Sequence, residues 1–118
     1  MKALLTKFFR FSASHAAGEK IYGHNYVLGV TVDALTPAAE RSFETAVESA
    51  LIQRLESRDL GLHVDFLKGI EITDAGLLHA FWKVLEEKIK PARLRSLSLE
   101  RDSRTRPVIA RSVSDEAI

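Results

Sequence analysis

The chain has 118 residues, a length typical of one domain, and its 46% apolar and 28% charged residues are typical of a globular protein. Its formal net charge of +1 favours neither a nucleic-acid nor a membrane partner. The absence of cysteine excludes disulfides, thiolate metal ligands and a cysteine nucleophile, and it fits a cytoplasmic protein.

The first half of the chain predicts two strands and then a helix. Residues 3–13 are rich in Leu, Phe and Thr, and residues 25–35 alternate well and contain many β-branched side chains, so we expect a strand over each range. Apolar residues at helical spacing predict a helix over about 38–56. Thr36 can cap this helix, and Pro37 suits its first position.

The second half predicts a loop, a second helix and two further strands. Residues 58–71 break the helical pattern and are expected to form a loop with short extended pieces. Apolar residues at helical spacing predict a helix over about 74–90, and Pro91 follows it directly as a stop. Residues 93–102 alternate as a third strand, and residues 106–112 can form a fourth that closes a hairpin with the third.

The element order predicted from these segments is β-β-α-α-β-β. Strand pairs on both sides of two helices indicate an α+β fold, with a four-stranded antiparallel sheet that carries both helices on one face. We expect a single domain over residues 1–118. A sheet this small leaves open edges, which favours self-association.

Two of the four histidines could form a metal site. His15 follows the end of the first predicted strand and His24 precedes the second, so pairing of the strands would bring them together. Zinc commonly binds imidazole nitrogen, and a catalytic zinc site needs three protein ligands. Two histidines can equally be ordinary loop residues. His63 has no partner at ligand spacing, and His79 lies beside the apolar stripe of the second helix.

The segments "FSASH" and "GHNY", followed by an alternating strand, resemble the 6-pyruvoyltetrahydropterin synthase family, which includes the 6-carboxytetrahydropterin synthases of queuosine biosynthesis. The likeness continues, in order and spacing, through "LESRDLGLHVDFLKGIEITDAGLLHAFWKVL", so it covers nearly the whole chain. The resemblance implies that family's tunnelling fold, which has the same β-β-α-α-β-β order. It also implies a homo-oligomer, a trimer or two stacked trimers forming a hexamer, in which a shared barrel removes the sheet edges.

The resemblance also implies zinc. The family binds it through three histidines, one after the first strand and two in a His-Gly-His before the second. His15 and His24 match the first and third of these ligands, and Tyr22 stands in place of the second. A neutral phenol, with an ordinary pKa of about 10, is a weaker ligand than imidazole.

The catalytic positions depart from the family pattern. The cysteine that commonly acts as the base falls on Gly18, whereas Glu19 matches the spacing of a glutamate that some members use. A carboxylate beside a metal-polarised substrate could remove a proton, although Glu19 can also be a solvated loop residue. The family's Asp-His pair falls on Glu56 and Ser57, and serine cannot hold a proton near neutral pH as imidazole does.

The substrate-binding positions are altered as well. The glutamate that holds the pterin ring falls on Arg101, and the adjacent Glu100 could replace it if the strand bulges. Thr73 matches a family threonine. Arg101, Arg104 or Arg106 could meet a triphosphate, or could simply be charged residues on a surface hairpin.

The resemblance implies a divergent, zinc-assisted lyase acting on 7,8-dihydroneopterin triphosphate. The alternative is a family member without catalysis that acts as a pterin- or purine-binding module or as an oligomeric assembly module, because fold alone does not determine function.

Overall fold

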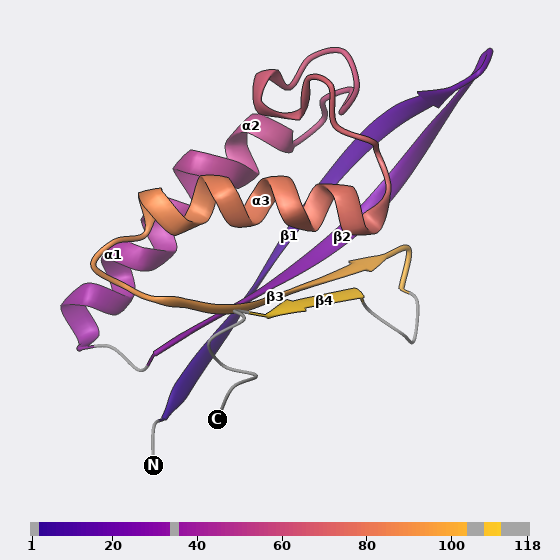
Figure 1. The fold of residues 1–118 in the computed structure, drawn as a ribbon. Coiled ribbons are helices and arrows are strands. Elements are labelled where there is room, and N and C mark those ends of the chain that lie inside the picture. Colours follow the sequence, from indigo (N-terminus) through magenta and orange to yellow (C-terminus); the bar gives the residue numbers. More distant parts are fainter. Residues whose placement is uncertain (1–2, 34–35, 104–107, 112–118) are drawn as a thin grey trace.

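The structure is a computed structural model that describes residues 3–33, 36–103 and 108–111. Its longest elements are two strands that pair with each other (Figure 1). β1 (Leu4–Ala17) and β2 (Lys20–Asp33) pair antiparallel along their whole length without a register shift. Only Gly18 and Glu19 connect them, and Gly18 has a φ of 65°, a left-handed conformation that glycine adopts readily.

The predicted loop around the histidines was wrong, because both histidines lie inside strands. His15 belongs to β1 and His24 to β2. Pairing of β2 with the third strand begins only at Tyr26, so residues 12–17 and 20–25 form a two-stranded arm that extends beyond the rest of the sheet (Figure 1). Much of this arm is exposed, so its sequence lacks the apolar alternation by which strands are usually predicted.

The rest of the sheet follows the prediction. β3 (Leu94–Arg101) pairs antiparallel with β2, β4 (Val108–Arg111) pairs antiparallel with β3, and the strand order is β1-β2-β3-β4. The register of β2 against β3 shifts between Thr31 and Val32. Residues 34–35 and the outer positions of the predicted fourth strand, 106–107 and 112, lie outside the described residues.

Both predicted helices are confirmed. The first comprises α1 (Pro37–Val47), a π-helical turn η1 (Glu48–Ile52) and α2 (Gln53–Leu55), and the Thr36 hydroxyl accepts a hydrogen bond from the Ala39 N–H at 3.3 Å. The second is α3 (Asp74–Lys88). A short 3₁₀ turn η2 (Asp65–Leu67) interrupts the loop between them.

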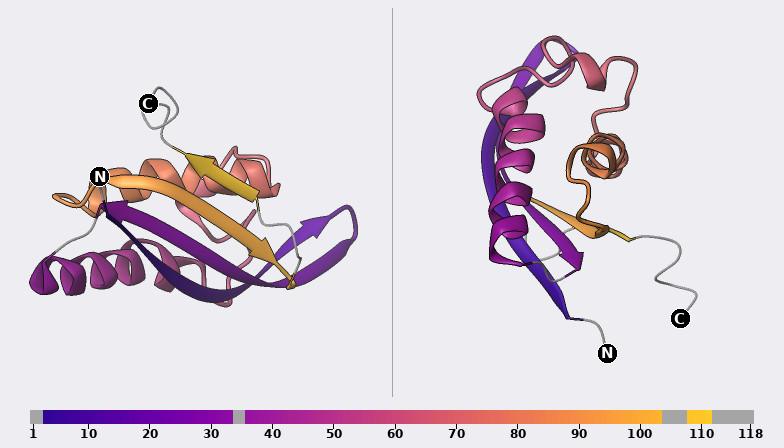
Figure 2. Two further views of the ribbon diagram at one scale, coloured as in Figure 1. Left: turned by 90° about the horizontal axis from the view of Figure 1, so that it is seen from below. Right: turned by 90° about the vertical axis from the view of Figure 1, so that its left-hand side faces the viewer.

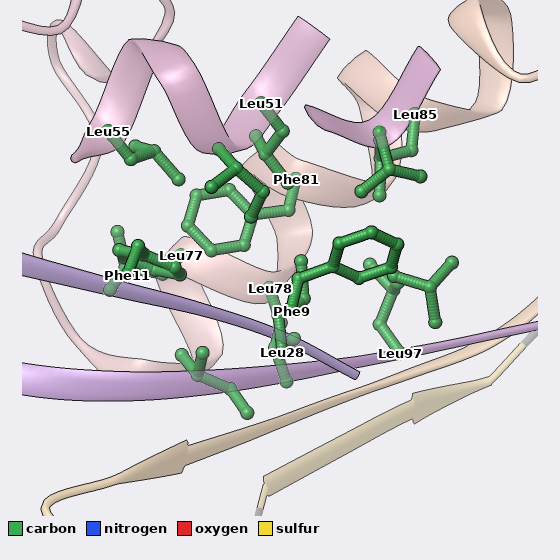
Figure 3. Packing of buried hydrophobic residues seen from close by; sticks show 14 of the residues in the cluster. Phe9, Phe11, Leu28, Leu51, Leu55, Leu77, Leu78, Phe81, Leu85 and Leu97 are labelled. Atoms are coloured by element: carbon green, nitrogen blue, oxygen red, sulfur yellow. The ribbon is translucent and has the colours of Figure 1, made fainter. Parts of the chain in front are cut away.

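The helices cover one face of the curved sheet, and the core lies between these two layers (Figure 2). Figure 3 shows the contact, in which aromatic and leucine side chains of both layers interdigitate. The central residues are at most 4% exposed: Phe9, Phe11, Leu28 and Leu97 from the sheet, and Leu51, Leu55, Phe81 and Leu85 from the helices. Each such side chain contributes about 1.5–3 kcal/mol on burial. The predicted α+β class, with helices on one face of an antiparallel sheet, is thereby confirmed.

Within the described ranges, no helix is long and apolar enough to cross a membrane.

The core assignment can be tested with a matched pair of leucine truncations. Leu85 is fully buried and Leu62 is 75% exposed. Leu85→Ala should lower the free energy of unfolding by about 2–5 kcal/mol, because it leaves a cavity between α3 and the sheet. Leu62→Ala should change it by less than about 0.5 kcal/mol. Urea denaturation measures both, and equal losses would contradict the placement of α3.

Candidate metal centre on the hairpin arm

A row of rings runs along one face of β1 and β2, from the core to the exposed arm. Phe11 stacks on Tyr26 with ring centroids 4.8 Å apart, and Tyr26 meets the edge of His24 at 5.9 Å. The imidazoles of His24 and His15 stack at 5.2 Å, and Tyr22 lies 6.1 Å from His15. The row exists because alternate residues of a strand share a face. The structure thus brings together the three metal ligands suggested by the sequence.

The centroid separation of His15 and His24 is compatible with a shared metal ion, which would require their in-plane nitrogens, rather than their stacked faces, to turn toward it. Two imidazoles bound to one tetrahedral zinc, with Zn–N bonds of about 2.0–2.1 Å, have ring centroids about 5 Å apart. The observed separation of His15 and His24 is 5.2 Å. In addition, the buried Nδ1 atom of His15 has no hydrogen-bond partner among the described residues, and a metal ion would satisfy it. The described residues contain no group of three or more His, Asp or Glu side chains able to hold a metal, so a three-ligand site here requires Tyr22.

A carboxylate that sequence reasoning missed is bound to one of the histidines. The Nδ1 atom of His24 lies 2.6 Å from Oδ2 of Asp102, and the other oxygen of Asp102 accepts the Asn25 N–H at 2.9 Å. The Asn25 N–H, and then the His24 ring, lower the pKa of the Asp102 carboxyl below its usual value. Asp102 directly follows β3, where the sequence indicated only an exposed strand end. Nothing local in the sequence links it to His24.

Arg101 lies on the same face of the sheet as His24, opposite Tyr26 in the strand pairing. Its Nε atom is 3.7 Å from Oδ1 of Asp74, and both side chains are largely buried. Burial raises the pKa of the neighbouring Tyr26 hydroxyl. Arg101 therefore ties the end of β3 to the first turn of α3, beside the row of rings.

Glu100 faces the opposite way. It pairs with Val27, and the pairing of β2 and β3 is regular from Tyr26 to Thr31. The bulge that would have turned Glu100 toward the histidines is absent, so Glu100 lies on the other face of the sheet from His15 and His24.

The two candidate catalytic carboxylates are not joined to the histidines. Glu19 occupies the exposed turn at the end of the arm. Glu56 follows α2, and its Oε2 atom accepts the Ser12 N–H at 3.1 Å. Within the described part of the chain, neither glutamate makes a hydrogen bond or ion pair with His15 or His24.

The segment that follows Glu56 attaches the arm to the rest of the molecule. Ser57 donates its N–H to the Ser12 carbonyl at 2.6 Å, and Ser14 exchanges hydrogen bonds with Arg58 and Leu60 at 2.9 and 2.7 Å. An open cavity of about 290 Å³ lies beside this junction and is bounded by Ser12, Ala13, Ser14, Gly23, His24, Asn25 and Ser57. Because alternate residues of a strand share a face, Ser12, Ser14, Gly23 and Asn25 lie on the face of the arm opposite to the rings of His15, Tyr22 and His24. The cavity therefore opens mainly on that other face, and His15 does not border it.

Thr73 has a structural contact. It is the N-cap of α3, and its hydroxyl accepts the Gly76 N–H at 3.1 Å. The chain is tight here, because a Cβ atom on Gly76 would lie 2.1 Å from the Glu71 carbonyl oxygen. The phosphate-binding candidates Arg104 and Arg106 lie outside the described residues.

The remaining two histidines, His63 and His79, are not part of the row of rings on the arm. His63 is exposed in the loop before η2. His79 of α3 lines a larger open groove of about 1290 Å³ between α3 and β4, whose apolar lining includes Leu78, Trp82 and Val108. None of the candidate ligands or carboxylates lines this groove.

No sequence profile of a known protein family matches the chain, and no curated protein matches its sequence. The structure is nevertheless similar to that of 6-pyruvoyl tetrahydropterin synthase from Caenorhabditis elegans, with a TM-score of 0.80 at 15% identity. The alignment covers 95% of this chain and 96% of that chain. The two proteins share a fold, and this agrees with the fold expected from the sequence resemblance.

Substitution of Tyr22 tests whether the row of rings is a ligand set. Tyr22→His should increase zinc affinity by more than about tenfold, or about 1.4 kcal/mol, because imidazole is the stronger ligand. Tyr22→Phe keeps the ring but removes the oxygen, and should weaken binding. Competition with a chromophoric chelator measures both affinities. Equal affinities for all three proteins would mean that Tyr22 does not face the metal.

Proposed function

We propose that the chain is a divergent pterin-synthase-type lyase that acts on 7,8-dihydroneopterin triphosphate, with zinc held by His15, Tyr22 and His24. The observation that carries the proposal is the gathering of these three side chains on one face of the arm, in a fold shared with a 6-pyruvoyl tetrahydropterin synthase.

Each residue has a distinct part in this proposal. His15, Tyr22 and His24 hold the metal, which would supply Lewis-acid polarisation of a substrate hydroxyl or carbonyl oxygen. Glu19 is the proposed base, because it is an exposed carboxylate on the turn that joins the two ligand-bearing strands. Arg101 lies directly opposite Tyr26, a member of the row of rings, in the pairing of β2 with β3. Although it also pairs with Asp74, its guanidinium group is the proposed partner of the substrate phosphates.

A second candidate function is a non-catalytic pterin- or purine-binding or assembly module. The observation that favours it is that the family-derived polar residues are engaged elsewhere. Glu56 binds the backbone of Ser12, Glu100 faces the other side of the sheet, and Thr73 caps α3. Such a module would keep the fold and the oligomer but would show no turnover.

The proposal includes a homo-oligomer, a trimer or hexamer, in the cytoplasm. β1 and β4 are the outer strands of the sheet, and among the described residues β4 and the first half of β1 each pair with one strand only. Leu4 and Phe8 on β1 and Ile109 on β4 are large apolar side chains that are more than half exposed. Unpaired edges with apolar side chains favour pairing with further copies of the chain.

Metal content is the first test of the lyase proposal. After zinc reconstitution and dialysis, mass spectrometry should find about one zinc per chain, and the double variant His15→Ala/His24→Ala should retain none. The wild-type protein should then convert dihydroneopterin triphosphate. Zinc without turnover would favour the binding module, and a protein that takes up no zinc would exclude the zinc-assisted lyase.

The role of Glu19 is tested by Glu19→Gln, which removes the base but keeps the size of the side chain. Turnover should fall by about 10²–10⁴, the usual contribution of a general base, while zinc content stays the same. Glu71→Gln is a suitable control because Glu71 is also an exposed loop carboxylate. A similar rate for Glu19→Gln and wild type would assign the base to another group.

A further inference from the structure

The carboxylate of Asp102 is held from two sides. Its backbone φ is 54°, a left-handed conformation that aspartate tolerates better than most residues. The backbone N–H of Asp102 donates to the Asn25 carbonyl at 2.8 Å, and Oδ1 accepts the Asn25 N–H at 2.9 Å. The second oxygen, Oδ2, meets Nδ1 of His24 at 2.6 Å. The direction of the carboxylate is thus set by β2 itself.

This contact has a consequence for the protons of the imidazole. An ionised carboxylate can only accept hydrogen bonds, so Nδ1 of His24 must carry the hydrogen. A neutral imidazole has one N–H, and its other nitrogen keeps a lone pair. In the neutral ring, Nε2 is therefore the atom that remains available as a metal ligand or proton acceptor.

The two histidines differ in this respect. His24 is 16% exposed in its side chain and has a carboxylate partner. The Nδ1 atom of His15 is buried and has no such partner in the part of the chain that the structure describes. Packing against the stacked ring of His15 restrains the plane of His24, but only the contact with Asp102 distinguishes one of its nitrogens from the other.

We propose that Asp102 is a positioning residue that fixes His24 as the Nδ1–H tautomer and presents Nε2 to the metal ion. The metal part of this inference rests on the proposed function. Carboxylate partners of ligating histidines fix the tautomer and ring orientation and make the imidazole a better ligand. Asp102 acts through His24, because both of its oxygens already accept contacts from β2.

The tautomer can be measured without any metal. ¹⁵N-labelled, metal-free protein is studied by NMR at alkaline pH, where imidazoles are neutral, and the His24 signals are assigned with His24→Gln. The wild-type spectrum should show a protonated Nδ1 and an unprotonated Nε2, and Asp102→Asn should lose this preference. A wild-type ring protonated on Nε2, or a spectrum unchanged in Asp102→Asn, would overturn the proposal.

Zinc affinity provides the second measurement, with Asp65→Asn as a matched control. Asp65 also accepts a backbone N–H, that of Phe66 at 2.8 Å, and also pairs with a basic side chain, Arg54. Both variants therefore lose one negative charge and a comparable pair of contacts. Asp102→Asn should bind zinc about 10–100-fold more weakly, the usual effect of losing such a partner, and Asp65→Asn should bind as wild type.

The two measurements separate the failure of this inference from the failure of the proposed function. Equal zinc affinities of Asp102→Asn and wild type would overturn the positioning role, even if the protein binds zinc well. If the wild type takes up no zinc, the proposed lyase fails, and the NMR spectrum alone decides whether Asp102 fixes the tautomer. Because the wild-type spectrum needs no variant, poor folding of Asp102→Asn would not prevent this decision.

Discussion

The alternation of side chains along one unbroken pair of strands is the constraint on which the site depends. Successive residues of a strand point to opposite faces. In a strand pair without a bulge, every second residue therefore stays on the same face along the whole length of the pair. β1 and β2 pair without a shift over their full length. The face that buries Phe9 and Leu28 in the core therefore also presents His15 and His24 on the arm. One inserted residue between Phe11 and His15 would turn that imidazole away.

The parts of the structure that could be predicted are those with local signals. Both helices begin at a threonine whose hydroxyl caps the first turn, and their apolar spacing matches the buried faces. The arm was not predictable as strand, because its exposed residues show no apolar alternation. The likeness to a known family suggested His15, Tyr22 and His24 as a group, and the rings of Tyr22 and His24 lie 6.1 and 5.2 Å from that of His15. The partner of His24 could not be found in this way, because Asp102 is 78 positions away in the sequence.

Many of the polar residues suggested by the family likeness form structural hydrogen bonds or ion pairs within the chain. Glu56 binds a strand backbone, Thr73 caps a helix, and Arg101 joins β3 to α3 through Asp74. The rings on the arm make contacts of a different kind, with one another and with Asp102. In this chain, Glu56 and Asp102 thus serve as acceptors for backbone or ring N–H groups, and the candidate ligands on the arm are imidazole and phenol groups.

The segment from Ser57 to Leu60 lies along the outer edge of β1 at Ser12 and Ser14 and forms hydrogen bonds there. Those backbone groups are no longer available to a strand from another molecule. Among the described residues, the longest stretch of this edge that remains open to an intermolecular strand is therefore the first half of β1, from Leu4 to Arg10. The segment from Ser57 to Leu60 thus limits how far an intermolecular sheet could extend along β1. The arm and its rings would remain outside that contact.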